Sequence, residues 1–137
     1  MKTVANRMTR TVLTLKEQDS LRDAVNLVQR NHIRHIPVLS GLSVVGIVTD
    51  RDIKRATPSL LSGVSQEDYD RVLDAVKISQ VMTRDPFTVT PATPLADAVK
   101  VLVDRRYGAL PVVEGGRLVG ILTSTDLLRT LHQMLVE

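Results

Sequence analysis

A tandem repeat constrains the fold of this chain more than any other feature of its sequence. Residues 8–56 recur as residues 82–130 at a constant offset of 74 positions, with no insertion or deletion, and 17 of the 49 aligned pairs are identical. Each copy is expected to be one supersecondary unit that buries its apolar face together with that of its neighbour. Any functional site should therefore occur twice. The identical pairs include Met8/Met82, Thr9/Thr83, Leu21/Leu95, Asp23/Asp97, Ala24/Ala98, Val25/Val99, Pro37/Pro111, Val38/Val112, Gly46/Gly120, Ile47/Ile121, Thr49/Thr123 and Asp52/Asp126.

The length of 137 residues fits one compact domain or two small units that share a core. Two independent domains of about 50 residues each would be only marginally stable, so we expect a single fused module. Its sequence divides into a first repeat (residues 1–56), an inter-repeat segment (57–80) and a second repeat (81–137). With one Phe, two Tyr and no Trp, aliphatic side chains must supply the core.

Composition excludes several classes of site. The absence of cysteine excludes a disulfide framework, a thiolate metal site and a cysteine nucleophile. There is no secretory signal pattern and no apolar run of about 18 residues, so we expect a cytoplasmic protein without a membrane span. The net charge of +3 comes from 18 basic and 15 acidic residues without a dense basic block. This favours a solvated helix face over a nucleic-acid interface.

Each repeat predicts the order strand, helix, strand, strand, helix. In the first copy, residues 11–15 indicate a short strand, and Ser20 is a suitable N-cap for a helix from Leu21. Residues 36–39 and 44–48 predict a hairpin, as do residues 110–113 and 118–122, and a second helix follows over about 52–55 and 126–135. Pro37 and Pro111 lie inside the first hairpin strands, which favours an edge position or a strand start. The apolar stripes of the first helices are Leu21, Ala24, Val25 and Val28, and Leu95, Ala98, Val99 and Leu102.

The inter-repeat segment has no counterpart elsewhere in the chain. Pro58 and the Ser/Gly content of residues 59–65 predict a loop. Ser65 and Asp68 then resemble a capping pair ahead of an amphipathic helix that includes Tyr69 and Leu73. This helix packs either on the module or on a partner.

The pattern G-x-x-T-x-x-D ends the hairpin of each copy, at Gly46–Asp52 and at Gly120–Asp126. Each pattern spans the end of an apolar strand and the first turn of a helix, where unpaired N–H groups and the helix dipole suit a phosphate. A threonine there can contact phosphate or sugar, and a carboxylate three residues later can accept hydrogen bonds from a ribose diol. The alternative is structural: the threonines are N-caps and the aspartates complete capping boxes.

The ordered set of motifs resembles the cystathionine-β-synthase (CBS) domain family. The set comprises M-T-R near the start of each copy, P-L-x-D-A-V at the helix start, an apolar-P-V strand and G-I-V-T-D-R-D at the end. Two copies resemble a CBS pair, or Bateman module, and residues 49–59 are similar to bacterial acetoin-utilisation-type CBS proteins. The resemblance implies an α/β (α+β) fold of two repeats related by a pseudo-two-fold axis and packed through their sheets. It also implies that adenosine-containing ligands bind in clefts between the repeats: AMP, ADP, ATP or S-adenosylmethionine.

The resemblance implies two clefts by matching of residues. In both, aspartate would hold the ribose, threonine the ribose or phosphate, and apolar side chains the adenine. One cleft would use Arg34, His35, Ile36, Pro37, Thr49, Arg51 and Asp52, closed by Thr90 and Thr93. The other would use Gly108, Ala109, Leu110, Pro111, Thr123 and Asp126, closed by Lys16 and Asp19.

The two clefts should differ in charge. Arg34 and His35 align with Gly108 and Ala109, and Arg51 aligns with Thr125. Because arginine chelates phosphate oxygens, the first cleft should prefer AMP, ADP or ATP, and the second should be smaller and more neutral.

No residue set supports catalysis. His32 and His35 lack further ligands at metal spacing, so we expect no metal site. No acid–base pair, nucleophile motif or oxyanion hole is evident, so we expect neither an enzyme nor a catalytic cofactor. The leading hypothesis is a stand-alone regulatory module that senses adenine nucleotides, forms a homodimer and acts on an unidentified regulated protein. The alternatives are an oligomerisation scaffold with empty clefts, S-adenosylmethionine or NAD binding, and nucleic-acid binding.

Overall fold

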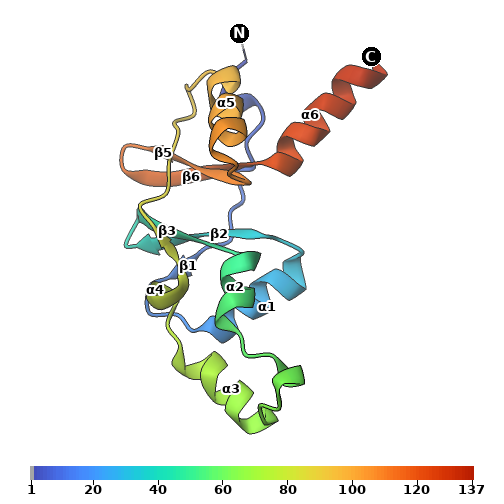
Figure 1. The fold of residues 1–137 in the computed structure, drawn as a ribbon. Coiled ribbons are helices and arrows are strands. Elements are labelled where there is room, and N and C mark those ends of the chain that lie inside the picture. The colour runs from blue at the N-terminus through green and yellow to red at the C-terminus, as the bar shows by residue number, and fades with distance from the viewer. Residues whose placement is uncertain (1) are drawn as a thin grey trace. The chain divides into compact units, whose positions relative to one another are not determined.

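The computed structural model describes residues 2–137 and shows a mixed α/β fold with two compact units. Unit 1 contains the segment up to Val12 together with Pro86–Glu137, and unit 2 contains Leu13–Asp85. Figure 1 shows the helices and strands of both units, coloured by their position along the chain. The predicted fold class is confirmed. Each unit has its own cluster of buried side chains.

Unit 2 is built on a four-stranded sheet in the order β1-β2-β3-β4. β1 (Leu15–Lys16) runs parallel to β2 (His35–Ser40), and β2 forms an antiparallel hairpin with β3 (Ser43–Thr49). The two-residue strand β4 (Thr83–Arg84) pairs with β3. Pro37 lies opposite Ile47 in the hairpin, beyond the short stretch where β1 pairs with β2. β2 is an inner strand of this sheet, so the predicted edge position is wrong for Pro37, which instead lies near the start of the strand.

The helix α1 (Leu21–Asn31) begins where the sequence predicts. The Ser20 hydroxyl accepts a hydrogen bond from the N–H of Asp23, and the Asp23 carboxylate accepts one from the N–H of Ser20. Such a capping box satisfies two donors that the first helical turn leaves unpaired. The helix ends at His32 in the left-handed region, with φ of 52°. The aligned residue Arg106 ends α5 (Leu95–Arg105) with φ of 57°.

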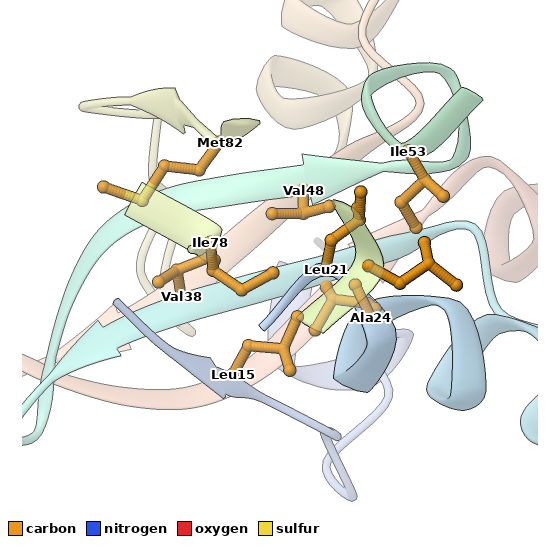
Figure 2. Close-up of a cluster of buried hydrophobic side chains, with 10 residues drawn as sticks. Leu15, Leu21, Ala24, Val38, Val48, Ile53, Ile78 and Met82 are labelled. Atoms are coloured by element: carbon orange, nitrogen blue, oxygen red, sulfur yellow. The ribbon is translucent and has the colours of Figure 1, made fainter. Parts of the chain in front are cut away.

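The core of unit 2 gathers side chains from the sheet and from its helices. Figure 2 shows these side chains meeting between the hairpin, α1, α2 (Asp50–Ala56) and α4 (Ile78–Val81). Leu21, Ile36 and Ile78 are fully buried. Burial of each such side chain contributes roughly 1.5–3 kcal/mol. These three side chains are aliphatic, as the near absence of aromatic residues leads one to expect.

The inter-repeat segment forms the predicted amphipathic helix, α3 (Gln66–Ala75), after the 3-10 turn η2 (Leu60–Ser62). The Ser65 hydroxyl caps it by accepting from the N–H of Asp68. Leu73 is buried in the core of unit 2, and the Arg22 guanidinium of α1 forms ion pairs with Asp70 and Asp74. The helix therefore packs on the module, which is the first of the two alternatives.

Unit 1 repeats the helix and hairpin of unit 2. It contains α5, the antiparallel hairpin β5 (Ala109–Glu114) and β6 (Arg117–Thr123), and α6 (Ser124–Val136). Where unit 2 has β1, unit 1 has a single parallel bridge from Val89 to Val112. The first strand of each copy is thus shorter than predicted, since residues 11–14 are not in a strand either. Figure 1 shows α6 running away from the end of β6.

The segment that begins each copy packs on the hairpin of the other copy. The N-terminal segment, with the 3-10 turn η1 (Val4–Asn6), lies in unit 1, and Thr9 pairs through its backbone with Ile121. In unit 2, Thr83 pairs in the same way with Ile47. The sequence did not predict η1, η2, α4 or β4, because each is too short to carry a periodic pattern.

Candidate functional site

The strand-to-helix junction of unit 2 is formed by the end of β3 and the first turn of α2. The Thr49 hydroxyl accepts from the N–H of Asp52 at 3.2 Å, and Asp52 Oδ2 accepts from the N–H of Thr49 at 3.0 Å. Asp52 Oδ1 has one cationic neighbour, the Arg55 guanidinium at 3.6 Å. The pair joins an exposed guanidinium to a largely buried carboxylate three residues away in the same helix, and its long distance makes it a loose contact.

The start of β2 lies beside this junction. His35 faces Thr49 in the hairpin register, and the N–H of Asp50 donates to the carbonyl of Arg34 at 3.0 Å. Ile36 and Pro37 follow and are buried. The structure therefore brings together the residues predicted for the first cleft that belong to this copy.

The junction of unit 1 has the same backbone arrangement. Ala109 faces Thr123 across the hairpin, and the N–H of Ser124 donates to the carbonyl of Gly108 at 3.0 Å. Leu110 and Pro111 are buried. The matching residues of the second copy thus also lie together.

Both junctions contain the capping boxes that the structural alternative predicted. Thr123 caps α6 as Thr49 caps α2, with Asp126 Oδ2 accepting from the Thr123 N–H at 2.9 Å. The boxes use one carboxylate oxygen of each aspartate. The two readings are therefore compatible, because a capping carboxylate keeps its second oxygen available to a ligand unless another group occupies it.

Asp126 has a partner that the sequence did not predict. The Thr9 hydroxyl donates to Asp126 Oδ1 at 2.9 Å, and the Thr123 hydroxyl donates to Asp126 Oδ2 at 3.1 Å. The only signal in the sequence is the identity of Thr9 and Thr83 between the copies. That identity does not show that a segment of one copy contacts the other.

The charges around the two junctions differ as the alignment predicts. In unit 2, Arg34 precedes β2, Arg51 is in the first turn of α2, and Lys54 and Arg55 are in its last turn; all four are exposed. The aligned residues of unit 1 are Gly108, Thr125, Leu128 and Arg129. Three of four cationic positions are therefore neutral in unit 1, so an anion is attracted more strongly to the junction of unit 2.

The imidazole of His35, at the start of β2, has a pKa below its ordinary value. Burial lowers the pKa of its imidazole below the ordinary 6.5, and the nearby Arg34 lowers it further, whereas Asp50 opposes the shift. Burial acts in this direction because it disfavours the charged imidazolium. His35 is therefore neutral at pH 7 and can serve as a hydrogen-bond donor and acceptor.

The residues predicted to close the clefts form similar turns. Thr93 Oγ1 accepts from the N–H of Thr90 at 3.0 Å, and Asp19 Oδ2 accepts from the N–H of the aligned Lys16 at 2.8 Å. Thr90 and Thr93 belong to unit 1 and line a groove of about 260 Å³ beside α5. Lys16 and Asp19 belong to unit 2. Their part in ligand binding stays a prediction.

The described residues contain neither a metal-binding cluster nor a membrane-spanning helix. Across residues 2–137, there is no group of three or more His, Cys, Asp or Glu side chains arranged to hold a metal ion. Within the same residues, no helix has the length and apolar character required to cross a bilayer.

Known structures with the same architecture were found by comparison. A Vibrio cholerae protein assigned to acetoin utilization (AcuB) superposes with a TM-score of 0.83, at 30% identity, over 98% of this chain and 93% of the other. CBSX2, known from Arabidopsis thaliana, has been solved in complex with AMP; it superposes with a TM-score of 0.81, at 28% identity, over 98% of both chains. These likenesses cover both repeats and the segment between them.

Sequence relatives fall into two groups by length. A CBS domain-containing protein of Dictyostelium discoideum is 32% identical over 134 residues, which are 96% of this chain and 92% of the relative. An inosine-5'-monophosphate dehydrogenase of Korarchaeum cryptofilum is also 32% identical, but the chain spans only 22% of its length. The family model described as the CBS domain matches residues 2–59 and 78–133. The resemblance found in the sequence is thereby confirmed: the chain belongs to the CBS domain family and carries the domain twice.

Proposed function

We propose that this chain is a regulatory module that binds AMP, ADP or ATP at its strand-to-helix junctions and passes a conformational change to a partner protein or to a second copy of itself. The observation that carries the proposal is the junction of unit 2. There a helix start, a threonine, an aspartate with an oxygen that accepts no hydrogen bond within residues 2–137, and the cationic residues Arg34 and Arg51 adjoin the buried apolar residues at the start of β2.

Each part of a nucleotide has a matching group at this junction. Asp52 Oδ1 can accept a hydrogen bond from a ribose hydroxyl, as the acidic residue of dinucleotide sites does. Arg34 and Arg51 carry delocalised charge that suits phosphate oxygens. Ile36 and Pro37 offer an apolar surface for the purine. AMP bound to CBSX2, at 28% identity, supports this ligand class.

The junction of unit 1 is a second candidate position with a different preference. It has the same threonine and aspartate, but Gly108 and Ala109 replace the charged residues. We expect a ligand there to be recognised with less dependence on phosphate. S-adenosylmethionine or NAD is the alternative ligand to be tested.

Regulation would operate by a shift of populations. A ligand that binds one arrangement of the module more tightly than another favours that arrangement in proportion to the difference in affinity. The output surface we propose is α6, which exposes Leu128, Leu131 and Leu135 along one face. A homodimer through this face would carry the change to the second copy.

Isothermal titration of the full chain with AMP, ADP and ATP tests the proposal. We expect Asp52→Ala to weaken binding at least tenfold, because it removes a charge-assisted hydrogen bond to the ribose. Asp126→Ala is titrated in parallel. If both variants kept wild-type affinity, the site assignment would be wrong.

Asp23→Ala is the matched control. Asp23 completes the capping box of α1 in the same way that Asp52 completes that of α2, but it belongs to another helix and is not part of the junction. The two variants lose the same type of helix cap. A loss of affinity in Asp52→Ala that is absent in Asp23→Ala is therefore due to the ligand contact and not to the cap.

An oligomerisation scaffold is the second candidate, favoured by the exposed leucines of α6. A ligand that binds only the folded state raises the melting temperature, by an amount that grows with its concentration. Thermal-shift measurements with millimolar AMP, ATP, S-adenosylmethionine and NAD separate the candidates. Stabilisation by none of the four would support the scaffold.

A further inference from the structure

Asp52 and Asp126, the aspartates of the two G-x-x-T-x-x-D patterns, differ in their hydrogen-bond partners. Asp126 accepts three hydrogen bonds: from the Thr9 hydroxyl on Oδ1, and from the N–H and hydroxyl of Thr123 on Oδ2. The side chains of both aspartates are largely buried, Asp126 at 6% and Asp52 at 10% exposed, so burial does not distinguish them. Asp52 accepts one hydrogen bond from residues 2–137, from the N–H of Thr49 on Oδ2. Its Oδ1 has only the loose ion pair with Arg55, which Asp126 also has with Arg129.

The difference arises from one pair of aligned threonines. Thr9 and Thr83 both pair through the backbone with a β-strand, opposite Ile121 and Ile47 respectively. The Thr9 hydroxyl reaches the aspartate of that unit, whereas Thr83 is exposed and no hydrogen bond within residues 2–137 joins it to Asp52. Equivalent sequence positions therefore have different side-chain partners.

The backbone around Thr9 has contacts of its own besides the hydroxyl bond to Asp126. Its N–H donates to the carbonyl of Ile121 at 2.8 Å, and its carbonyl accepts from the N–H of Ile121 at 2.9 Å. The segment before it is anchored by Val4, which is fully buried, and by a hydrogen bond from Arg7 to Gln133 of α6 at 2.8 Å. These contacts position the hydroxyl beside Asp126, the hydrogen bond between them adds to the attachment of the segment, and a ligand at Oδ1 would have to displace the hydroxyl.

We infer that Thr9 is a specificity-determining residue. Its hydroxyl occupies Asp126 Oδ1, so that of the two aspartates only Asp52 has a carboxylate oxygen that accepts no hydrogen bond from the described residues and can bind a ligand diol. This inference rests on the proposed function and assigns different roles to the aspartates of the two repeats. The first repeat supplies the nucleoside-binding carboxylate. The second repeat uses the same residue to fasten residues 4–9 to β6 and α6.

The first test measures AMP binding to the full chain by titration. Asp52→Asn weakens AMP at least tenfold, while Asp126→Asn leaves the affinity within about twofold of wild type. In the Asp52→Asn background, Thr9→Ala frees Asp126 Oδ1 and restores AMP affinity at least tenfold, and Thr9→Ser, which keeps the hydroxyl, restores none. An equal loss in Asp126→Asn and Asp52→Asn, or no effect of Thr9→Ala in that background, would overturn the inference.

The second test needs no nucleotide, so it distinguishes this inference from the proposed function. Thr9→Val keeps a β-branched side chain but removes the hydroxyl, and Thr83→Val is its aligned control. Hydrogen exchange of the Val4, Ala5 and Thr9 amides should accelerate about tenfold in Thr9→Val and stay at the wild-type rate in Thr83→Val. Unchanged exchange in Thr9→Val would refute the fastening role even if AMP binds. If wild type binds no nucleotide but exchange accelerates, the proposed function fails and the fastening role holds.

Discussion

The side chain of Met8 packs directly on Gly120. A methyl group on residue 120 would lie 2.8 Å from Met8 Sδ and 2.9 Å from the carbonyl oxygen of Thr9. The other hairpin has the same contact: a methyl group on Gly46 would lie 2.5 Å from Met82 Sδ and 3.0 Å from the carbonyl oxygen of Thr83. Glycine is therefore required at both positions by close backbone approach, and not by an unusual φ angle.

Gly120→Ala should lower the free energy of unfolding by about 1–3 kcal/mol, the usual range for an overpacked site. Urea unfolding monitored by circular dichroism gives the value. Met8→Ala leaves a cavity and is itself destabilising. Because it removes the contact with sulfur but not that with the Thr9 carbonyl, the cost of Gly120→Ala should be smaller in the Met8→Ala background than in wild type, but not zero. Wild-type stability in Gly120→Ala would show that the N-terminal segment does not pack here.

The helices and hairpins of the repeats could be predicted because their patterns occur twice, and the helix between the repeats because its cap and apolar spacing are local. Ser20 before Leu21 and Ser65 before Gln66 are side-chain caps whose chemistry is local, and the structure confirms both. The exchange of segments between copies could not be predicted. An offset of 74 aligns Met8 with Met82 and Gly46 with Gly120, but it does not show that Met8 contacts Gly120. Such a contact depends on chain connectivity, which a periodic pattern does not contain.

The candidate site was predictable to the same extent. The motif places Thr49 and Asp52 in one helical turn, and the hairpin register that brings His35 opposite Thr49 follows from the turn between the strands. The sequence predicts only one of the two differences between the surroundings of Asp52 and Asp126. The alignment predicts the charge difference, but the hydrogen bond from Thr9 joins residues 117 positions apart and has no local signature.

His35 should make stability depend on pH. Because its pKa in the folded protein lies below the ordinary 6.5, the unfolded chain binds a proton first as the pH falls. The free energy of unfolding contributed at His35 is therefore constant above this range, decreases as the pH falls through 6.5, and becomes constant again below the folded pKa. Urea unfolding between pH 5 and 8 should show this decrease in wild type and a smaller one in His35→Gln.

His132→Gln is the control for that experiment, since it removes a histidine from α6 and leaves the start of β2 intact. The imidazole resonance of His35 should also titrate below pH 6.5 in NMR spectra. A titration midpoint above 6.5 would contradict the effect of burial. A pH dependence in His35→Gln identical to that of wild type would assign the effect to other groups.

Arg34 should control discrimination between phosphorylated and unphosphorylated ligands. We expect Arg34→Ala to weaken ATP by about tenfold and adenosine by less than about twofold, because a charged contact with phosphate is lost while the contacts with the nucleoside remain. Titration with both ligands gives the ratio. Arg30→Ala, an exposed arginine in the last turn of α1, is the control for net charge. Equal weakening of ATP and adenosine would place Arg34 away from the phosphates.

The exposed face of α6 should mediate self-association. Leu131 and Leu135 are 48% and 74% exposed and one helical turn apart, so they present a continuous apolar surface with Leu128. We expect wild type to be a dimer by light scattering, and Leu131→Glu with Leu135→Glu to be a monomer, because two carboxylates cannot be buried without partners. Leu61→Glu is the matched control: Leu61 is 99% exposed in η2, outside this face. A monomeric wild type, or a dimer that survives both α6 substitutions, would exclude α6 as the dimer interface.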